Sequence, residues 1–156
     1  MEREERYRNL RADVEAVLGG EQDPIMWMAT LACLIREHLG FFWVGFYRMV
    51  DGELLVGPYQ GTLGCVRITL ERGVCGACAM QKRTINVSDV HQFPGHIACD
   101  ERSQSEIVVP VFDAAGELRA VLDIDSDQLD CFDSLDERQL ESLVAEMRGL
   151  RWDRLS

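Results

Sequence analysis

The sequence predicts an α+β fold: a single domain with an antiparallel sheet of about six strands. N- and C-terminal helices are expected to pack on one face of this sheet, with a site loop on the other. Amphipathic helical patterns occupy both ends of the chain, and short β-rich segments separated by tight turns fill the middle. The 156 residues, 47% of them hydrophobic, suit one domain with a sizeable core.

Two helices are predicted at the N-terminus. Residues 3–18 place apolar side chains three and four positions apart, and Gly19 ends this pattern. A second helix begins with Asp23 as N-cap and Pro24 in the first helical position, and it ends at Gly40. Because this helix is apolar on nearly every side, we expect it to be largely buried.

The middle of the chain alternates strands with turns. The pair Asp51-Gly52 is a strong hairpin signal, and Ala115-Gly116 marks a second turn. The expected strands cover residues 41–49, 53–56, 65–70, 84–87, 106–112 and 118–124. A short helix is expected over 76–82, a loop over 90–103 and a last amphipathic helix over 135–152.

Composition and charge exclude several classes of partner. The formal net charge is −11, from 16 basic and 27 acidic residues, whereas nucleic acids and anionic membranes require a basic face. The charged N-terminus does not fit a signal peptide, and no apolar run approaches the ~18 residues of a membrane span. We therefore expect a cytoplasmic protein without nucleic-acid or membrane partners. Its six cysteines are then thiols that are catalytic, metal-binding or inert.

One of these cysteines stands in an unusual setting. Cys99 lies in the polar, acid-rich segment 96–106, directly before a strongly apolar strand. A cysteine in a polar loop is more often exposed and reactive than one among apolar neighbours. Cys65 and Cys75 lie beside glycines on candidate loops, so the three cysteines indicate a redox device, a metal site or a coincidence.

Several motifs resemble the free methionine-(R)-sulfoxide reductase family, a catalytic branch of the GAF domains. They are Gly73-Val74-Cys75-Gly76, Asp89-Val90, Phe93 to Asp100, Ser103, Ser105 to Pro110 and Leu122 to Ser126. The resemblance runs from about residue 41 to residue 132. It implies one GAF-like catalytic domain over 1–156, with N-terminal helices at 1–40, sheet and site loops at 41–132 and a C-terminal helix at 133–156.

The resemblance also implies an activity: reduction of free L-methionine (R)-S-oxide to methionine, with thioredoxin as external reductant and no bound cofactor or metal. By the same match, Cys99 is the nucleophile, Cys65 the first choice of resolving cysteine and Cys75 the second. The implied substrate pocket contains Trp43, Tyr47, Glu106, Asp123 and Asp125. The family and the apolar helices together favour a homodimer.

The pocket residues suit that substrate chemically. Carboxylates pair with the α-ammonium group of a free amino acid, whereas a peptide amide would leave them desolvated and unpaired. Trp43 and Tyr47 stand at an even spacing on one strand, so they point the same way and can pack around the S-methyl group. On periodicity alone, Asp123 and Asp125 would instead form the solvent face of a strand.

The acidic surroundings constrain the mechanism. Asp100 and Glu106 lie near Cys99 in the sequence, and negative neighbours raise a thiol pKa, so we do not expect a permanently ionised nucleophile. A carboxyl group that stays protonated among other carboxylates can protonate the sulfoxide oxygen, and Glu106 with Asp125 is our hypothesis for that role.

Several alternative interpretations accompany this one. Cys75-x-x-Cys78 with His96-x-x-Cys99 has ligand types that suit zinc, and Cys75-Gly-Ala-Cys78 also imitates a thioredoxin motif. His96 could pair with Cys99, although we favour a structural role for it. Cys75 could be a small buried residue at a helix start. Finally, the domain could be a GAF module that senses a small molecule without chemistry.

Overall fold

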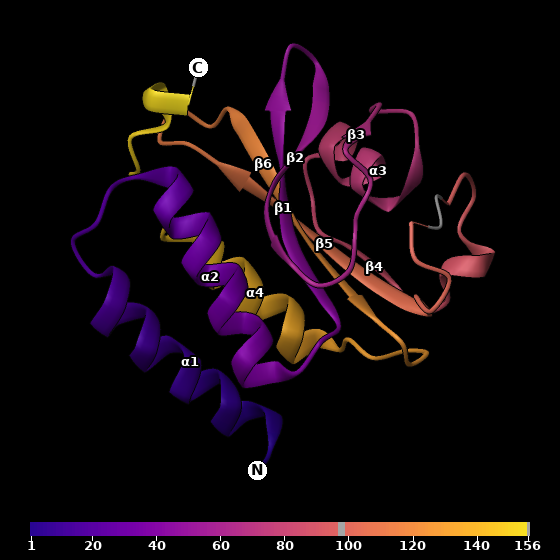
Figure 1. Cartoon of the computed structure of the whole chain (residues 1–156), viewed down its shortest axis with the longest axis horizontal. Helices are drawn as coiled ribbons and strands as arrows, with labels where there is room; N and C mark the ends of the chain where they lie inside the picture. The colour runs from indigo at the N-terminus through magenta and orange to yellow at the C-terminus, as the bar shows by residue number, and fades with distance from the viewer. Residues whose placement is uncertain (97–98, 156) are drawn as a thin grey trace.

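The computed structural model describes residues 1–96 and 99–155. Its helices and strands form the predicted α+β domain. The helices α1 (Arg3–Leu18), α2 (Pro24–Leu39) and α4 (Ser134–Ala145) lie on one side of the sheet, and α3 (Gly73–Gln81) lies on the other (Figure 1). Two residues of the quoted motif, Ile97 and Ala98, lie outside the described residues.

A single antiparallel sheet of six strands forms the middle layer, as the sequence predicts. The strand order is β3-β2-β1-β6-β5-β4. The strands are β1 (Trp43–Val50), β2 (Glu53–Gln60), β3 (Arg67–Ile68), β4 (Ile85–Val87), β5 (Ser105–Phe112) and β6 (Leu118–Ser126). Short 3₁₀ turns follow β4 (η1, Val90–Gln92) and close the chain (η2, Trp152–Leu155).

Local sequence signals explain the ends of several elements. The Asp23 side chain accepts a hydrogen bond from the Met26 backbone N–H at 2.9 Å, and Gly40 closes α2 with a φ of 76°. At the β1–β2 hairpin, Asp51 and Gly52 take φ values of 50° and 79°, as a two-residue turn between twisted strands requires. These predictions are confirmed.

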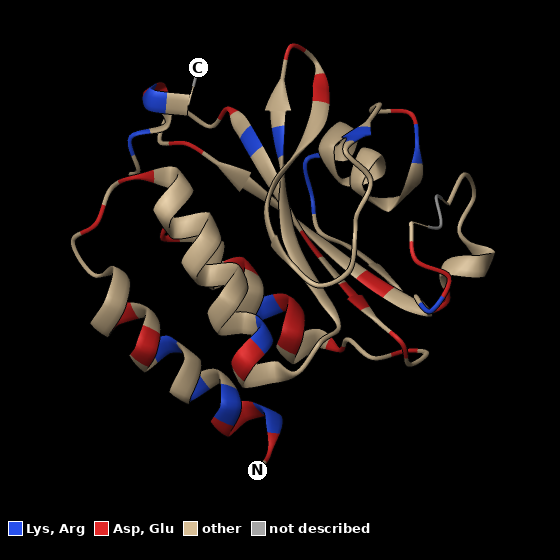
Figure 2. Ribbon diagram, viewed as in Figure 1, with Lys and Arg blue, Asp and Glu red and all other residues tan. Residues whose placement is uncertain are grey.

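The two faces of the sheet carry separate apolar cores. The first joins α1, α2 and α4 to one face, with Tyr7, Phe46 and Leu122 among its buried members. The second joins α3 to the opposite face and includes Trp43, Tyr47 and Cys75. Figure 2 shows α2 almost free of charge except at its C-terminal end, consistent with a helix packed between α1 and the sheet.

Three sequence predictions differ in detail from the structure. α2 was expected to be largely buried, and its core-facing residues are, but Ile25 and Met26 in its first turn are 53% and 42% exposed. The strand expected over 65–70 shrinks to β3, because Cys65 belongs to the loop before it. The strand expected over 53–56 instead continues to Gln60, paired along β1.

The last helix is shorter than the predicted 135–152 and does not fill 133–156. It ends at Ala145, after which the backbone tightens into successive three-residue turns such as Met147 N–H to Val144 O at 3.0 Å. The Arg151 N–H then bonds to the Gln22 carbonyl at 2.9 Å, a partner in a distant loop that an extended helix could not reach. Among the residues that the structure describes, no helix has the length and apolar character needed to cross a bilayer.

Candidate active site

The strand register places several predicted pocket residues side by side on the adjacent strands β1, β6 and β5. Asp125 of β6 lies opposite Trp43 of β1 on one side and opposite Glu106 of β5 on the other. Asp123 stands two residues before Asp125 and so shares its face, which is the face turned toward α3. The aspartates therefore do not form a solvent face, as periodicity alone would suggest.

A pocket opens on this face of the sheet between α3 and two loops. Its lining includes seven of the eight predicted site residues: Trp43, Tyr47, Cys75, Cys99, Glu106, Asp123 and Asp125. The eighth, Cys65, is covalently attached to the pocket rim through Cys99. The structure thus gathers the residues that the sequence singled out, although their roles stay predictions.

Cys65 and Cys99 form a disulfide across the mouth of the pocket, with a Cα–Cα distance of 5.7 Å. It joins the loop after β2 to the loop before β5, which lie 34 residues apart in the chain. Cys99 is exposed and Cys65 is half-buried, so the bond is accessible from solvent. This is the pair that the first choice of resolving cysteine predicts.

A polar clamp holds the same two loops together. The Thr62 hydroxyl donates to the Asp100 carboxylate at 2.7 Å, and the Arg102 guanidinium donates to both carboxylate oxygens at 3.1 and 2.8 Å. These hydrogen bonds, first from Arg102 and then from Thr62, hold the pKa of Asp100 well below its ordinary value. Sequence reasoning treated Asp100 only as a negative neighbour of Cys99 and missed its partners, since Thr62 lies 38 residues away.

Aromatic rings form one wall of the pocket. Trp43 stacks on Tyr47 with ring centroids 5.9 Å apart and on Tyr59 at 5.1 Å, and its indole N–H donates to the Thr62 carbonyl at 2.8 Å. A Cβ atom on Gly64 would lie 2.7 Å from the Trp43 ring, so only glycine fits there. The sequence analysis missed Tyr59, because a bulge in the β1–β2 pairing breaks the alternation along β2 between Val56 and Tyr59.

Three carboxyl groups form the floor. Glu106 and Asp123 are buried and Asp125 is half-buried, and burial raises the pKa of each above its ordinary value. Mutual repulsion adds to this effect for Glu106, which faces both aspartates. The Ser103 hydroxyl donates to Asp125 at 3.3 Å, a contact that the sequence did not reveal. Such a floor holds protons unless a cation arrives.

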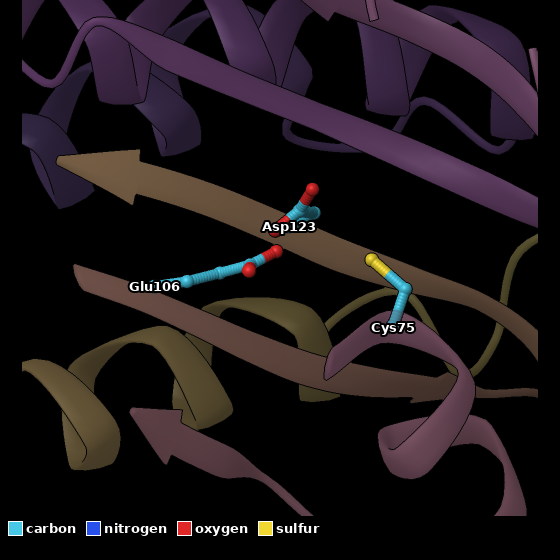
Figure 3. Close-up of side chains that lie close together, drawn as sticks. All are labelled: Cys75, Glu106 and Asp123. Carbon is cyan, nitrogen blue, oxygen red and sulfur yellow. The ribbon is translucent and has the colours of Figure 1, made fainter. Parts of the chain in front are cut away.

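Cys75 lies at the start of α3 with its thiol turned toward the acids (Figure 3). It is buried, and burial followed by the charges of Asp123 and Glu106 raises the pKa of its thiol well above the ordinary value. The raised pKa favours the protonated form of the Cys75 thiol. One alternative from the sequence was that Cys75 is a small buried residue at a helix start. It is buried there, and it also lines the pocket.

The ligand set of the predicted zinc alternative is not gathered. Cys99 is bonded to Cys65, and Cys78 is fully buried in α3. His96 does line the pocket, with its pKa lowered by partial burial and by nearby His91. The preceding strand and α3 do not form a βαβ unit, because the whole sheet is antiparallel, which disfavours the thioredoxin comparison.

The chain matches known proteins over most of its length. Residues 28–148 match the family described as the GAF domain. The free methionine-R-sulfoxide reductase of Escherichia coli is 40% identical over 148 residues, which is 94% of this chain and 89% of that protein. The chain belongs to the free methionine-R-sulfoxide reductase family. The fold and family implied by the sequence motifs are thereby confirmed.

Solved structures of this reductase family superimpose closely. The free methionine-R-sulfoxide reductase from Neisseria meningitidis, in complex with its substrate, is 41% identical with a TM-score of 0.87 and covers 91% of this chain and 86% of its own. The Staphylococcus aureus enzyme in its reduced form is 40% identical with a TM-score of 0.87, covering 91% and 92%. The fold shared with these reductases therefore covers most of this chain.

Proposed function

We propose that the protein reduces free methionine (R)-sulfoxide to methionine by thiol chemistry. The observation that carries this proposal is the Cys65–Cys99 disulfide at the mouth of a pocket floored by carboxyl groups, in a chain of this family. A cysteine pair that closes into a disulfide can supply two electrons. The carboxyl floor suits a ligand that carries an ammonium group.

The reaction starts from the reduced protein. The Cys99 sulfur attacks the sulfoxide sulfur, the oxygen passes to Cys99 as a sulfenic acid, and methionine leaves with its sulfur reduced. The Cys65 thiol then displaces water from the sulfenic acid and forms the disulfide. An external dithiol reduces this bond and is itself oxidised to a disulfide. Each step conserves atoms, and one sulfoxide is converted for each disulfide formed.

The floor carries two tasks in this proposal. Glu106, whose pKa is raised, retains a proton that it donates to the sulfoxide oxygen, and Asp125 shares that proton across the strand pair. Asp123 accepts the substrate ammonium group. A methionine sulfoxide within a peptide lacks that ammonium, so it leaves Asp123 without a cation and is rejected. The stacked Trp43 and Tyr47 pack against the S-methyl group.

The reductant is a protein dithiol of the thioredoxin class. Leu63 and Val66 on either side of Cys65 are 77% and 66% exposed, which supplies an apolar surface beside an accessible disulfide. Four further cysteines are free thiols, in keeping with the reducing environment of the cytoplasm.

The exposed apolar side chains Val17, Ile25 and Met26 near the α1–α2 turn support a homodimer. Light scattering of the wild type and of Ile25→Glu tests that assembly.

One assay tests the proposed function. Free methionine (R)-sulfoxide, free methionine (S)-sulfoxide and a peptide containing methionine sulfoxide are each supplied with the protein and a dithiol. We expect turnover of the first substrate alone, and none with Cys99→Ser. Binding of the free sulfoxide without turnover would instead support the sensing module, and turnover of the peptide would contradict the role given to Asp123.

A further inference from the structure

The pocket floor joins a thiol to two carboxyl groups from three different elements. Cys75 comes from the first turn of α3, Glu106 from β5 and Asp123 from β6, and their side chains converge (Figure 3). Their ligand atoms all lie within 4.8 Å of one another, and all three residues are buried. Within residues 1–96 and 99–155, no other group of three His, Cys, Asp or Glu side chains has this spacing.

Not every buried polar atom of this floor has a hydrogen-bond partner. Asp123 Oδ1 is fully buried and has no hydrogen-bond partner among the described residues. No Lys or Arg forms an ion pair with Glu106, Asp123 or Asp125 in the described part of the chain. Buried acids without a cationic partner must hold protons or bind a cation. The orphaned oxygen and the nearby thiol therefore point to a cation that accepts both oxygen and sulfur.

We propose that Cys75, Glu106 and Asp123 form a zinc(II) site, and that the bound ion inhibits the enzyme by occupying the floor of its pocket. One thiolate and two carboxylates are ligand types that zinc accepts, and three protein ligands leave a fourth position for water. Magnesium and calcium prefer sites made only of oxygen, so the sulfur of Cys75 discriminates against them.

The spacing of the three groups is compatible with tetrahedral coordination. Zinc–sulfur and zinc–oxygen bonds of about 2.3 and 2.1 Å place neighbouring ligand atoms roughly 3.5 Å apart. The three ligand atoms, within 4.8 Å of one another, reach this separation by small side-chain rotations. Binding displaces protons from the thiol and the carboxyl groups, so affinity rises with pH.

The inhibitory effect, unlike the binding, rests on the proposed function. Zinc bound at Asp123 and Glu106 neutralises the groups that accept the substrate ammonium and protonate the sulfoxide oxygen. It also holds Cys75 as a metal-bound thiolate. Because Cys65 and Cys99 are joined in the disulfide, they offer no thiolate to the ion in the oxidised protein.

The binding experiment uses the oxidised, metal-free protein. It is titrated with cobalt(II), whose thiolate charge-transfer absorption reports sulfur coordination, and zinc is then measured by competition with a chromophoric chelator. We expect one equivalent of cobalt with a charge-transfer band that zinc removes. Cys75→Ser should abolish the band and weaken zinc binding by at least about tenfold, and Asp123→Asn should weaken it similarly.

Cys78→Ser is the matched control. Cys78 is a buried cysteine one turn farther along α3 and lies outside the ligand group, so this variant should keep both the band and the affinity. Circular dichroism of each variant checks folding, and Glu106→Gln replaces Cys75→Ser if the latter does not fold. A band that persists in Cys75→Ser, or equal zinc affinity in wild type and Asp123→Asn, overturns the site.

A single-turnover assay without added thiols tests inhibition. Pre-reduced protein is mixed with free methionine (R)-sulfoxide with and without one equivalent of zinc, and the methionine formed per chain is followed in time. We expect zinc to slow the turnover and excess substrate to restore it. Zinc binding by a protein that makes no methionine refutes the proposed function alone, whereas unimpaired turnover with zinc present refutes the inhibition.

Discussion

Two buried aspartates on opposite faces of the sheet have opposite surroundings. Asp136, on the helix side, is 0% exposed and accepts hydrogen bonds from the Tyr7 hydroxyl at 2.7 Å, from Arg3 at 2.8 Å and from the Asp133 N–H at 2.9 Å. Asp123, on the pocket side, is 5% exposed, and its Oδ1 has no partner among the described residues.

The difference separates an acid whose charge is matched within the protein from one that has no cationic partner among the described residues. Asp136 ties α1 to the capping box of α4, so its charge is matched within the protein. The polar neighbours of Asp123 are other acids and a thiol, so a negative charge on it has no counter-ion in the part of the chain that the structure describes. A buried carboxylate that is paired with a cation and fully hydrogen-bonded is compensated within the fold, whereas one with an unpaired oxygen and no cationic partner costs stability.

The largest effect should come from breaking the satisfied cluster. Asp136→Ala leaves the buried Tyr7 hydroxyl without its acceptor and removes the carboxylate partner of Arg3, which keeps its hydrogen bonds to Cys131, so we expect a loss of about 3 kcal/mol in the free energy of unfolding. Urea denaturation followed by circular dichroism measures it. The paired variant Asp123→Ala should unfold no more easily than the wild type. Equal destabilisation by both changes would abolish the distinction.

The second prediction concerns activity. Asp123→Asn removes the charge proposed to bind the substrate ammonium, so kcat/KM for free methionine (R)-sulfoxide should fall about 100-fold, or roughly 2.7 kcal/mol. Thermal stability should stay equal or rise, because an unmatched buried charge is gone. Asp127→Asn, a change at an exposed acid outside the pocket, is the control and should leave kcat/KM unchanged. A similar loss in that control would refute the assignment.

The third prediction is a pH dependence of stability. The pKa of Glu106 in the folded protein is raised well above its ordinary value of 4.5. At a pH between 4.5 and the folded-state pKa, the folded state therefore holds a proton that the unfolded state has released. Stability contributed by that proton is complete below pH 4.5 and is lost as the pH rises through the folded pKa. Unfolding free energies measured across this window should fall by up to about 1.4 kcal/mol per pH unit.

Glu106→Gln sharpens that measurement. The amide cannot titrate, so the difference between wild type and variant isolates the contribution of this carboxyl group. We expect the fall to become shallower in the variant, with the remainder due to Asp123 and Asp125, whose pKa values are also raised. An unchanged profile would show that Glu106 is not protonated in the fold.

The smallest effect should follow from opening the surface clamp. Arg102→Ala removes the guanidinium from the half-buried Asp100 carboxylate, which keeps its hydrogen bond from Thr62, and an ion pair with an exposed partner contributes little to stability. We expect no measurable change in unfolding but a few-fold slower closure of the Cys65–Cys99 disulfide, measured by rapid quench and alkylation. Arg119→Ala, which breaks the comparable Arg119–Asp113 pair far from the cysteines, should leave closure unchanged.

Locally encoded features were predictable from sequence. The limits of α2 followed from Asp23, Pro24 and Gly40, and the β1–β2 hairpin from Asp51-Gly52, because each depends on the backbone preferences of a few neighbouring residues. The end of α4 was not predictable, because Ala145 is followed by turns whose geometry depends on a bond from Arg151 to the distant Gln22 loop.

The sequence by itself determined the fold class and the reductase family, and it singled out the cysteines and acids that the structure gathers at the pocket, because these are carried by motifs and by periodicity. Only the tertiary structure decided how they meet. Strand register placed Asp125 between Trp43 and Glu106, and the packing of α3 on the sheet brought Cys75 to the acids. Burial, and with it the raised pKa values of the floor, is a property of that packing, since the same carboxyl groups in an extended chain would be hydrated and ionised.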